Sequence, residues 1–228
     1  MRIVITGANR GIGLELTRQM LARGDSVIAA ARHPKKAEDL ESLRAKHPDR
    51  LRVLPVDVSS DKSVKALAES VTSAVDALIN NAGTSGESSS LGALDFDDAL
   101  DVYSVNALGP LRMTRAFLPH LHKGEGKRVL HVTSGMGSIG DNSSGGFYGY
   151  RMSKAALNMA SRSLAADLRG EGILSAVINP GWVRTDMGGP RATVTVKDSA
   201  TGILAQLDAL TADQSGQFLD YSGKTWEW

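Results

Sequence analysis

The chain of 228 residues has the length of one domain, and its 42% hydrophobic content suffices for a sizeable core. Its 26 basic and 25 acidic residues nearly cancel and form no basic block, which argues against a nucleic-acid partner. The absence of cysteine excludes disulfides and thiolate metal sites, and the lack of a targeting segment or an apolar run of about 20 residues predicts a cytoplasmic protein with no membrane span.

Short apolar runs alternate along the chain with segments of helical periodicity. In chain order, the sequence predicts strands over 2–7, 25–32, 51–58, 76–83, 127–134, 174–181 and 216–223. Helices are expected over 11–23, 35–47, 60–74, 95–121, 150–170 and 197–210, the fourth of them interrupted near Gly109 and Pro110. This alternation predicts a single α/β domain over residues 1–228, in which a doubly wound parallel sheet carries helices on both faces.

The first predicted strand runs directly into TGANRGIG, residues 6–13, which contains Gly7, Gly11 and Gly13. Between a strand and a helix, such glycines permit a tight turn and let the backbone approach a phosphate, which the helix N-terminus attracts. Ligands of doubly wound sheets bind at the carboxyl ends of the strands, where this loop lies. The alternative is a turn in which the glycines only permit packing.

The residues that end the next strands bear on cofactor type. Arg32 lies 19 residues after Gly13, where an acidic residue would bind the ribose 2′-hydroxyl of NAD. With Arg10 in the glycine loop, Arg32 favours the 2′-phosphate of NADP, unless both are solvated surface charges. Asp57 ends the third strand and could accept a hydrogen bond from the adenine amino group. The run 80–83, Asn-Asn-Ala-Gly, ends the fourth and would let the backbone approach the cofactor; either feature could be only a turn.

Tyr150 and Lys154 are four residues apart near the start of a predicted helix, so their side chains share one face. A cation about 4 Å from a phenolate stabilises it by roughly 4 kcal/mol, which bounds the shift of the tyrosine pKa at about three units. We therefore expect Lys154 to bring the pKa of Tyr150 from about 10 toward 7, where acid–base catalysis is most effective. Tyr148 has Met152 at the equivalent position. The alternative is that Tyr150 packs and Lys154 is solvated.

Two polar residues complete a candidate reactive centre. Ser134 ends the fifth predicted strand and could donate a hydrogen bond to a substrate carbonyl oxygen, with Ser138 as a rival in the glycine-containing stretch that follows. Asn106 lies inside a predicted helix, an unfavourable place for asparagine. It is either a surface residue or a side chain turned inward to hold water.

These features occur in the order and at the positions that the short-chain dehydrogenase/reductase family shows, and the chain resembles that family over essentially its whole length. The motifs are TGANRGIG at 6–13, DV at 57–58, NNAG at 80–83, Asn106, Ser134, YRMSK at 150–154 and NPGWVRT at 179–185. The sequences around 137–158 and 215–228 are similar to the C-factor/sniffer-like carbonyl reductase branch. The resemblance implies a seven-stranded Rossmann fold that binds a nicotinamide dinucleotide.

The resemblance also implies roles for individual residues. Tyr150 would exchange a proton with the carbonyl oxygen, Lys154 would lower the pKa of Tyr150 and hold the nicotinamide ribose, Ser134 would polarise the carbonyl, and Asn106 would position a relay water. Arginine after the second strand, as at Arg32, marks preference for NADP(H) over NAD(H). The cofactor-binding residues it implies are Gly7, Asn9, Arg10, Gly11, Ile12, Gly13, Arg32, Asp57, Val58, Asn81, Ala82, Gly83, Tyr150, Lys154, Pro180, Gly181, Val183 and Thr185.

We therefore expect an NADP(H)-dependent oxidoreductase that acts on a small or medium carbonyl or alcohol. No metal site is expected, since the histidines do not form a ligand set. Family members often form homodimers or homotetramers through helices equivalent to 95–121 and 150–170. The alternatives are a cofactor-binding signalling or regulatory protein with vestigial catalysis and a nucleotide-sugar epimerase or dehydratase, against which the glycine spacing and the short chain argue.

Two departures concern the substrate pocket. Tyr150 follows Ser134 by 16 positions, more than in most of the family, so a loop within 135–149 is expected beside the pocket. The short segment 186–196 replaces a longer lid and predicts an open pocket. Trp226 and Trp228 pack either at a subunit contact or against the sheet.

Overall fold

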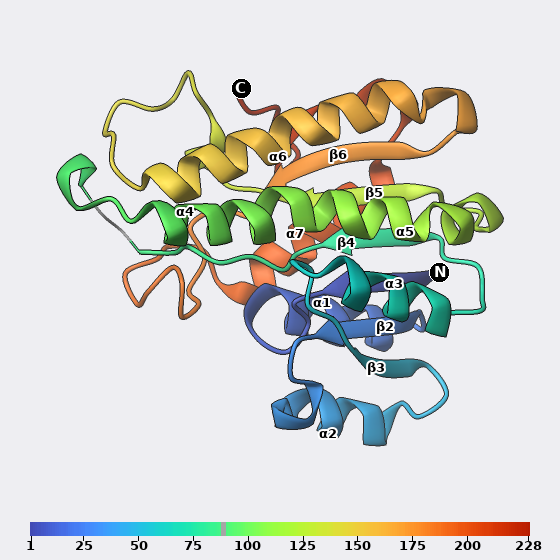
Figure 1. Cartoon of the computed structure of the whole chain (residues 1–228). Helices are drawn as coiled ribbons and strands as arrows, with labels where there is room; N and C mark the ends of the chain where they lie inside the picture. The colour runs from blue at the N-terminus through green and yellow to red at the C-terminus, as the bar shows by residue number, and fades with distance from the viewer. Residues whose placement is uncertain (88–89) are drawn as a thin grey trace.

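The computed structural model describes residues 1–87 and 90–228. The polar stretch 84–92, between the fourth predicted strand and the predicted helix over 95–121, is expected to be a loop and lies partly outside the described residues. Within them, seven parallel strands form one sheet in the order β3-β2-β1-β4-β5-β6-β7 (Figure 1). The strands are β1 (Arg2–Thr6), β2 (Ser26–Ala31), β3 (Leu51–Pro55), β4 (Ala77–Asn80), β5 (Arg128–Val132), β6 (Leu174–Asn179) and β7 (Phe218–Asp220). The predicted fold is confirmed, and the strand order reverses between β1 and β4.

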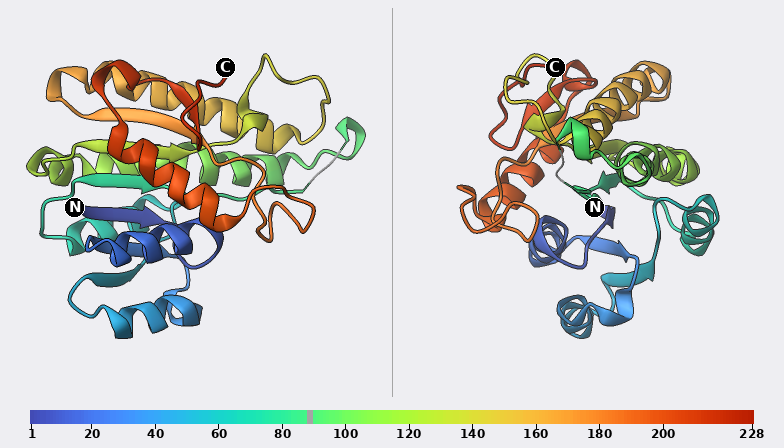
Figure 2. Two further views of the ribbon diagram at one scale, coloured as in Figure 1. Left: turned by 180° about the vertical axis from the view of Figure 1, so that it is seen from behind. Right: turned by 60° about the vertical axis from the view of Figure 1, so that its left-hand side comes forward.

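Helices cover both faces of this sheet (Figure 2). They are α1 (Gly11–Ala22), α2 (Glu38–Lys46), α3 (Asp61–Ser70), α4 (Phe96–Tyr103), α5 (Gly109–Lys123), α6 (Tyr148–Asp167) and α7 (Val196–Ala209). Among the residues described, no helix is both long enough and apolar enough to cross a bilayer.

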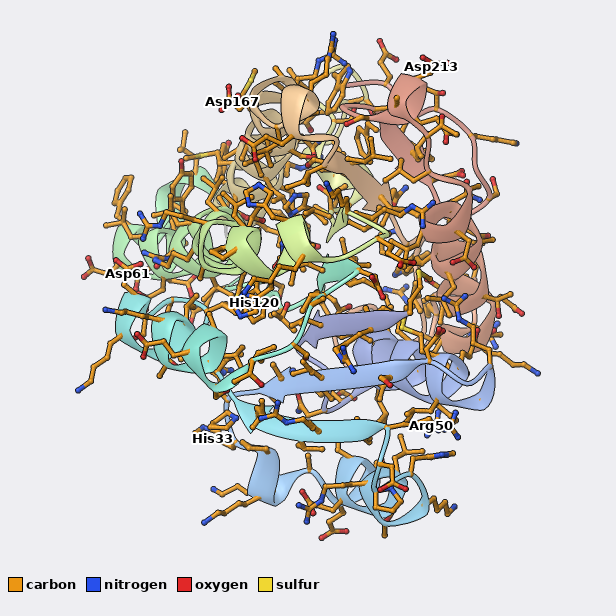
Figure 3. All side chains as sticks on the ribbon, turned by 90° about the vertical axis from the view of Figure 1, so that its right-hand side faces the viewer. His33, Arg50, Asp61, His120, Asp167 and Asp213 are labelled. Atoms are coloured by element: carbon orange, nitrogen blue, oxygen red, sulfur yellow. The ribbon has the colours of Figure 1, made fainter. Side chains whose placement is uncertain are left out.

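The core has two layers because side chains alternate across each strand. Ile3 and Ile5 of β1 pack into the layer under α1, α2 and α7, whereas Val4 packs into the layer under α3, α5 and α6. Phe117 of α5 is fully buried in the second layer. Nearby, His120 lies between α5 and α3 (Figure 3). This packing fixes the loops at the carboxyl ends of the strands.

The expected helix over 95–121 is divided by a wider turn. α4 gives way to a π-helical turn over Ser104–Leu108, in which the Gly109 amide donates to the Ser104 carbonyl, and α5 follows. Pro110 has no N–H to offer the carbonyl of Asn106, four residues earlier, so an unbroken α-helical ladder cannot run through this point. The interruption therefore begins earlier than the Gly109–Pro110 pair suggested.

The segment after β7 folds back along that strand. Asp220 closes the turn, since its carboxylate accepts hydrogen bonds from two main-chain amides within it. The Trp226 amide then donates to the Phe218 carbonyl at 2.6 Å. The Trp226 and Trp228 rings lie 6.3 and 5.5 Å from the Phe218 ring, measured between centroids. Both indoles thus pack at the edge of the sheet, one of the two arrangements that the sequence left open.

Candidate active site

A cleft of about 1000 Å³ opens at the carboxyl ends of the strands. Its lining includes these sequence-predicted residues: Gly7, Asn9, Arg10, Gly11, Ile12, Arg32, Asp57, Val58, Asn81, Ala82, Gly83, Tyr150, Lys154, Pro180 and Thr185. The fold therefore brings together the motifs that follow β1, β2, β3, β4 and β6 with the start of α6. Gly13, Asn106, Ser134, Gly181 and Val183 are not part of this lining.

The glycine loop needs glycine for two different reasons. Gly7 and Gly11 have φ angles of +65° and +53°, in the left-handed region that favours glycine. A Cβ on Gly7 would also lie 2.8 Å from the Cα of Ala82. Gly13 is different, because a Cβ there would overlap the Gly7 carbonyl oxygen and lie 2.5 Å from Asn81 Nδ2. Gly13 thus permits the loop to pack on itself, while Gly7 and Gly11 line the cleft.

Asn81 braces this loop from the neighbouring strand. Its Nδ2 donates to the carbonyls of Thr6 at 2.9 Å and Gly7 at 3.2 Å. In return, the Thr6 hydroxyl oxygen accepts the amides of Asn81 and Ala82, each at 3.0 Å. The NNAG run is therefore more than a turn, since it fixes the shape of the glycine loop across the point where the strand order reverses.

One end of the cleft is basic. Arg32 is exposed where β2 ends, Lys36 lines the cleft beside it, and His33 lies at the same end of the sheet (Figure 3). Arg10 is engaged differently, since its Nη1 forms an ion pair with Asp186 Oδ2 at 2.5 Å. Arg10 therefore shares its charge with Asp186 at the cleft, whereas no such ion pair engages Arg32 or Lys36 among the described residues.

Asp57 is held in its ionised form beside this basic end. Its Oδ1 accepts the hydroxyl of Ser59 at 2.6 Å and the amide of Ser59 at 2.9 Å. The hydrogen bond from the Ser59 side chain, assisted by the positive charges of Arg32 and Arg112, holds the pKa of Asp57 below its usual range. The carboxylate is an acceptor at the cleft, and its expected hydrogen bond with an adenine amino group stays a prediction.

Gly181 and Val183 lie behind the cleft and pack against neighbouring segments. Gly181 has a φ of +81°, and a Cβ there would lie 2.9 Å from the Tyr221 ring and 3.0 Å from Val194. Val183 is buried and bridges to Val194. These two residues hold the segment between Pro180 and Thr185, which itself borders the cleft.

Tyr150 and Lys154 lie one turn apart at the start of α6. The Lys154 side chain is buried and its Nζ donates to the Val132 carbonyl at 2.9 Å. Burial lowers the pKa of Lys154 to about 8 and raises the pKa of Tyr150, which a hydrogen bond with the Ser134 side chain opposes. The expected fall of the Tyr150 pKa toward 7 is not found. Burial of the phenol raises its pKa by more than the Ser134 side chain lowers it, and the Lys154 amine is directed at the Val132 main-chain carbonyl.

Ser134, not Ser138, is the serine whose side chain opposes the rise of the Tyr150 pKa. Its Oγ accepts the Met136 amide at 3.1 Å, which closes the turn that follows β5. Ser138 is buried instead, with its Oγ accepting the amide of Asp141 at 3.1 Å. The strand-end serine is thus the one placed beside the tyrosine.

Asn106 points inward from the π-helical turn and is fully buried. Its Oδ1 accepts the Thr84 amide at 2.9 Å, and its Nδ2 donates to the Thr84 carbonyl at 2.8 Å and the Ser153 hydroxyl at 3.0 Å. The surface alternative is excluded. Both amide hydrogens are used by the protein, so Asn106 ties the segment after β4 to α6.

Most of the chain matches one known family. The family model described as short chain dehydrogenase spans residues 1–194, which include the glycine loop, Ser134, Tyr150 and Lys154. The chain belongs to the short-chain dehydrogenase family. The expectation drawn from the order of the motifs is confirmed.

Relatives place the chain in the carbonyl reductase-like branch of the short-chain dehydrogenases. The C-signal protein of Myxococcus xanthus is 52% identical over 166 residues, which are 72% of this chain and all of that protein. The crystal structure of NADPH-bound carbonyl reductase from chicken fatty liver has a TM-score of 0.94 at 37% identity and covers 100% of this chain and 98% of its own. The carbonyl reductase Sniffer of D. melanogaster has a TM-score of 0.95 at 32% identity, with coverages of 100% and 99%.

Three residues of this short-chain dehydrogenase site were not predicted from the sequence. Thr6 and Ser153 bind Asn81 and Asn106, and Lys36 borders the cleft. The position of Thr6 at a strand end and the adjacent Lys35 and Lys36, a few residues after Arg32, were usable signals. Ser153 gave none, because its partner is 47 residues earlier and only the fold joins them.

Proposed function

We propose that the chain is an NADP(H)-dependent oxidoreductase that transfers hydride between nicotinamide and the carbonyl or alcohol group of a small or medium organic substrate. The carrying observation is the placement of Tyr150 at the cleft, with Lys154 one turn away on α6 and the Ser134 side chain beside the Tyr150 phenol. The family and the NADPH-bound carbonyl reductase of the same fold support the same reading.

The cleft fits a dinucleotide by its own features. Gly7 and Gly11 have no side chains, so a phosphate could approach the backbone closely at the start of α1. The first turn of α1, which lies within the described residues, also carries no acidic side chain that would repel a phosphate. The exposed guanidinium of Arg32 and the amine of Lys36 lie where a 2′-phosphate would be recognised. These cations, and the lack of a carboxylate at position 32, favour NADP(H) over NAD(H). Asp57 would accept a hydrogen bond from the adenine amino group.

In the reductive direction, a bound reduced nicotinamide would supply hydride to the carbonyl carbon. Tyr150 gives its phenolic proton to the carbonyl oxygen, so that the alcohol O–H bond forms as the phenol O–H bond breaks. Ser134 donates a hydrogen bond to that oxygen as negative charge develops on it. In oxidation, Tyr150 takes the proton back from the alcohol.

After it has protonated the carbonyl oxygen, Tyr150 must regain a proton, and Lys154, one turn away on α6, is the side chain proposed to supply it. With a pKa near 8, the Lys154 amine can lose and regain a proton close to neutral pH. A Cβ on Gly83 would lie 3.2 Å from Asn106 Oδ1 and 3.7 Å from Lys154 Nζ, so the amide oxygen and the amine flank the same glycine. We propose that a water at this point relays protons between Lys154 and solvent.

A cofactor-consumption screen tests the proposal directly. Purified protein is incubated with aldehydes, ketones and diketones, with NADPH and NADH in parallel. Carbonyl-dependent oxidation of NADPH, faster than that of NADH, is the expected result. NADPH binding without turnover across the whole panel would contradict it.

The second candidate function is an NADP(H)-binding signalling or regulatory protein in which catalysis is vestigial. The observation that favours it is the 52% identity to the C-signal protein. The same screen separates the two, because a signalling protein of this kind retains NADPH affinity without reducing any carbonyl. The intact set of Asn106, Ser134, Tyr150 and Lys154 favours the enzyme.

We also propose a homodimer or homotetramer formed through α4 and α6, which lie side by side (Figure 1). Phe96 and Leu100 of α4 are 73% and 66% exposed, and Met152 and Met159 of α6 are 60% and 67% exposed. Large apolar side chains gathered on neighbouring helices are typical of an interface. Light scattering is expected to give a multiple of the chain mass for the wild type and a smaller mass for Leu100→Glu. A monomeric wild type would contradict this assembly.

A further inference from the structure

Ser134 reaches Tyr150 from a short turn that α6 holds on one side. The turn is a 3-10 helix over Gly135–Gly137. A Cβ on Gly137 would lie 2.9 Å from the Cβ of Lys154, so the turn rests directly on α6. The Asn158 side chain also donates to the Gly137 carbonyl at 3.1 Å.

The other contact of the turn comes from the end of the chain. A Cβ on Gly135 would lie 3.2 Å from Cζ2 of Trp226 and 3.3 Å from Nδ2 of Asn179. The turn after Ser134 is therefore contacted both by the helix that carries Tyr150 and Lys154 and by the indole of Trp226. Its glycines have no side chains with which to fix its position.

Trp226 is itself firmly placed. Its amide donates to the Phe218 carbonyl at 2.6 Å, and its ring lies 6.3 Å from the fully buried Phe218 ring. The same segment continues along the loop that joins Ser134 to Tyr150, because the Gly140 amide donates to the Trp228 carbonyl at 2.9 Å. The indole thus lies between the edge of the sheet and the turn at Gly135.

We propose that Trp226 is a positioning residue for catalysis, whose indole supports the turn at Gly135 and so keeps the Ser134 hydroxyl in place beside Tyr150. This inference rests on the proposed carbonyl reduction and adds to it a residue outside the cofactor cleft. Removing the indole would let the turn move away from α6. The Tyr150 phenol would then lose the hydrogen bond that opposes the rise of its pKa, and the carbonyl oxygen would lose a fixed donor.

Graded substitutions separate positioning from general loss of stability. Trp226→Phe, Trp226→Leu and Trp226→Ala are compared with Trp228→Ala, which removes a ring that packs on the same Phe218 and on Arg162. We expect kcat to fall about 10- to 100-fold in Trp226→Ala, with partial rescue in Trp226→Phe and less than about threefold change in Trp228→Ala. The Kd for NADPH should stay within about twofold in all four. Equal losses of kcat in Trp226→Ala and Trp228→Ala would overturn the proposal. If Trp226→Ala does not fold, Trp226→Leu takes its place in this comparison.

A double-mutant cycle tests whether Trp226 acts through Ser134. In a Ser134→Ala background, Trp226→Ala is expected to cost less than about twofold in kcat, because the group that it positions is gone. The same fold-loss in both backgrounds would contradict this route.

Hydrogen exchange supplies a readout that needs no turnover. The Met136 amide donates to the Ser134 hydroxyl oxygen at 3.1 Å, and the Gly137 amide donates to the Ser134 carbonyl at 2.9 Å. They should exchange at least tenfold faster in Trp226→Ala than in Trp228→Ala, and equal exchange would refute the support. If the wild type reduces no carbonyl, the proposed function fails while this measurement still decides whether Trp226 holds the turn.

Discussion

Lys154 places its ammonium nitrogen 5.8 Å from the centroid of the Tyr150 ring. At this distance the pair shares one face of α6, but the amine is hydrogen-bonded to the Val132 carbonyl and its own charged form is disfavoured by burial. Because burial raises its pKa, the tyrosine is a protonated phenol rather than a preformed phenolate. Its protonated form is the one that reduction of a carbonyl requires.

Tyr150→Phe is expected to lower kcat for NADPH-dependent reduction by about 10²- to 10⁴-fold, the range that general acid catalysis supplies. Cofactor affinity should change by less than about twofold, because phenylalanine keeps the ring and removes only the hydroxyl. Turnover is measured by loss of NADPH absorbance and affinity by fluorescence titration. Tyr148→Phe is the matched control, since it removes a hydroxyl from the first residue of the same helix. Retained turnover in Tyr150→Phe would remove Tyr150 from the mechanism.

Arg32→Ala is expected to weaken NADPH binding about 10- to 100-fold, the worth of one or two hydrogen bonds to a charged group. NADH binding should not change, because NADH has no 2′-phosphate. Arg32→Asp should go further and favour NADH. Affinities are measured by titration at two salt concentrations, with Lys65→Ala on the exposed face of α3 as a charge-matched control. Unchanged NADPH affinity in Arg32→Ala would assign the phosphate to other cations, such as Lys36.

The sheet was predictable because each strand is a compact apolar run. The shared helix face of Tyr150 and Lys154 was predictable because helical spacing depends only on local sequence. What escaped prediction depends on contacts between distant segments. The direction of the Tyr150 pKa shift follows from burial and from a carbonyl on β5, neither of which the tyrosine's neighbours reveal. Gly13 looked like a phosphate contact because the motif does not say which glycines face a ligand. The contact of Trp226 with Gly135 required knowing that the chain folds back after β7.

Lys154→Met is expected to stabilise the protein at neutral pH while abolishing turnover. The pKa of Lys154 is about 8 in the folded state against 10.5 for the ordinary side chain, so the unfolded chain binds the extra proton between these values. The contribution of Lys154 to the free energy of unfolding is fully present above pH 10.5 and is lost as pH falls through 8. Below pH 8 the folded protein is therefore less stable by about 3 kcal/mol than it would be with a neutral amine. Part of the gain is offset because the Val132 carbonyl loses its donor, leaving about 1–2 kcal/mol.

Thermal melts of the two proteins at pH 7 and pH 10.5 check this expectation. Lys154→Met should melt about 2–6 °C above the wild type at pH 7, and the difference should shrink or reverse at pH 10.5. A variant less stable than the wild type at pH 7 would show that the buried ammonium is fully compensated. The outcome bears on function, because it measures how much stability this site gives up to keep an amine beside Tyr150.

His131 is expected to make the fold sensitive to mild acid. It is fully buried in β5, where the Asn80 side-chain nitrogen lies 3.2 Å from Nδ1 and the Ser175 hydroxyl lies 3.3 Å from Nε2. The Thr114 hydroxyl donates its hydrogen to the Pro110 carbonyl, so its oxygen accepts a hydrogen bond from Asn80 Nδ2. The amide group of Asn80 therefore presents its nitrogen, a donor, to His131, and His131 Nδ1 is the acceptor. The ring is therefore held neutral, and burial lowers its pKa from 6.5 to about 3.

Since the folded-state pKa of His131 lies below the unfolded value, its contribution to stability is present above pH 6.5 and is lost as pH falls toward 3. The free energy of unfolding should fall by about 1.4 kcal/mol per pH unit through this one group. Urea unfolding at pH 6.5, 5.5 and 4.5 measures the slope, and comparison of the wild type with a His131 variant removes the contribution of carboxylates that titrate near pH 4.5. His131→Gln should flatten the slope by about one proton, and His33→Gln, after β2 on the exposed surface, is the control for the loss of an imidazole outside the core. A slope in His131→Gln equal to that of the wild type would mean that His131 takes up its proton in the folded state, and that the buried network between β4, β5 and β6 tolerates the charge.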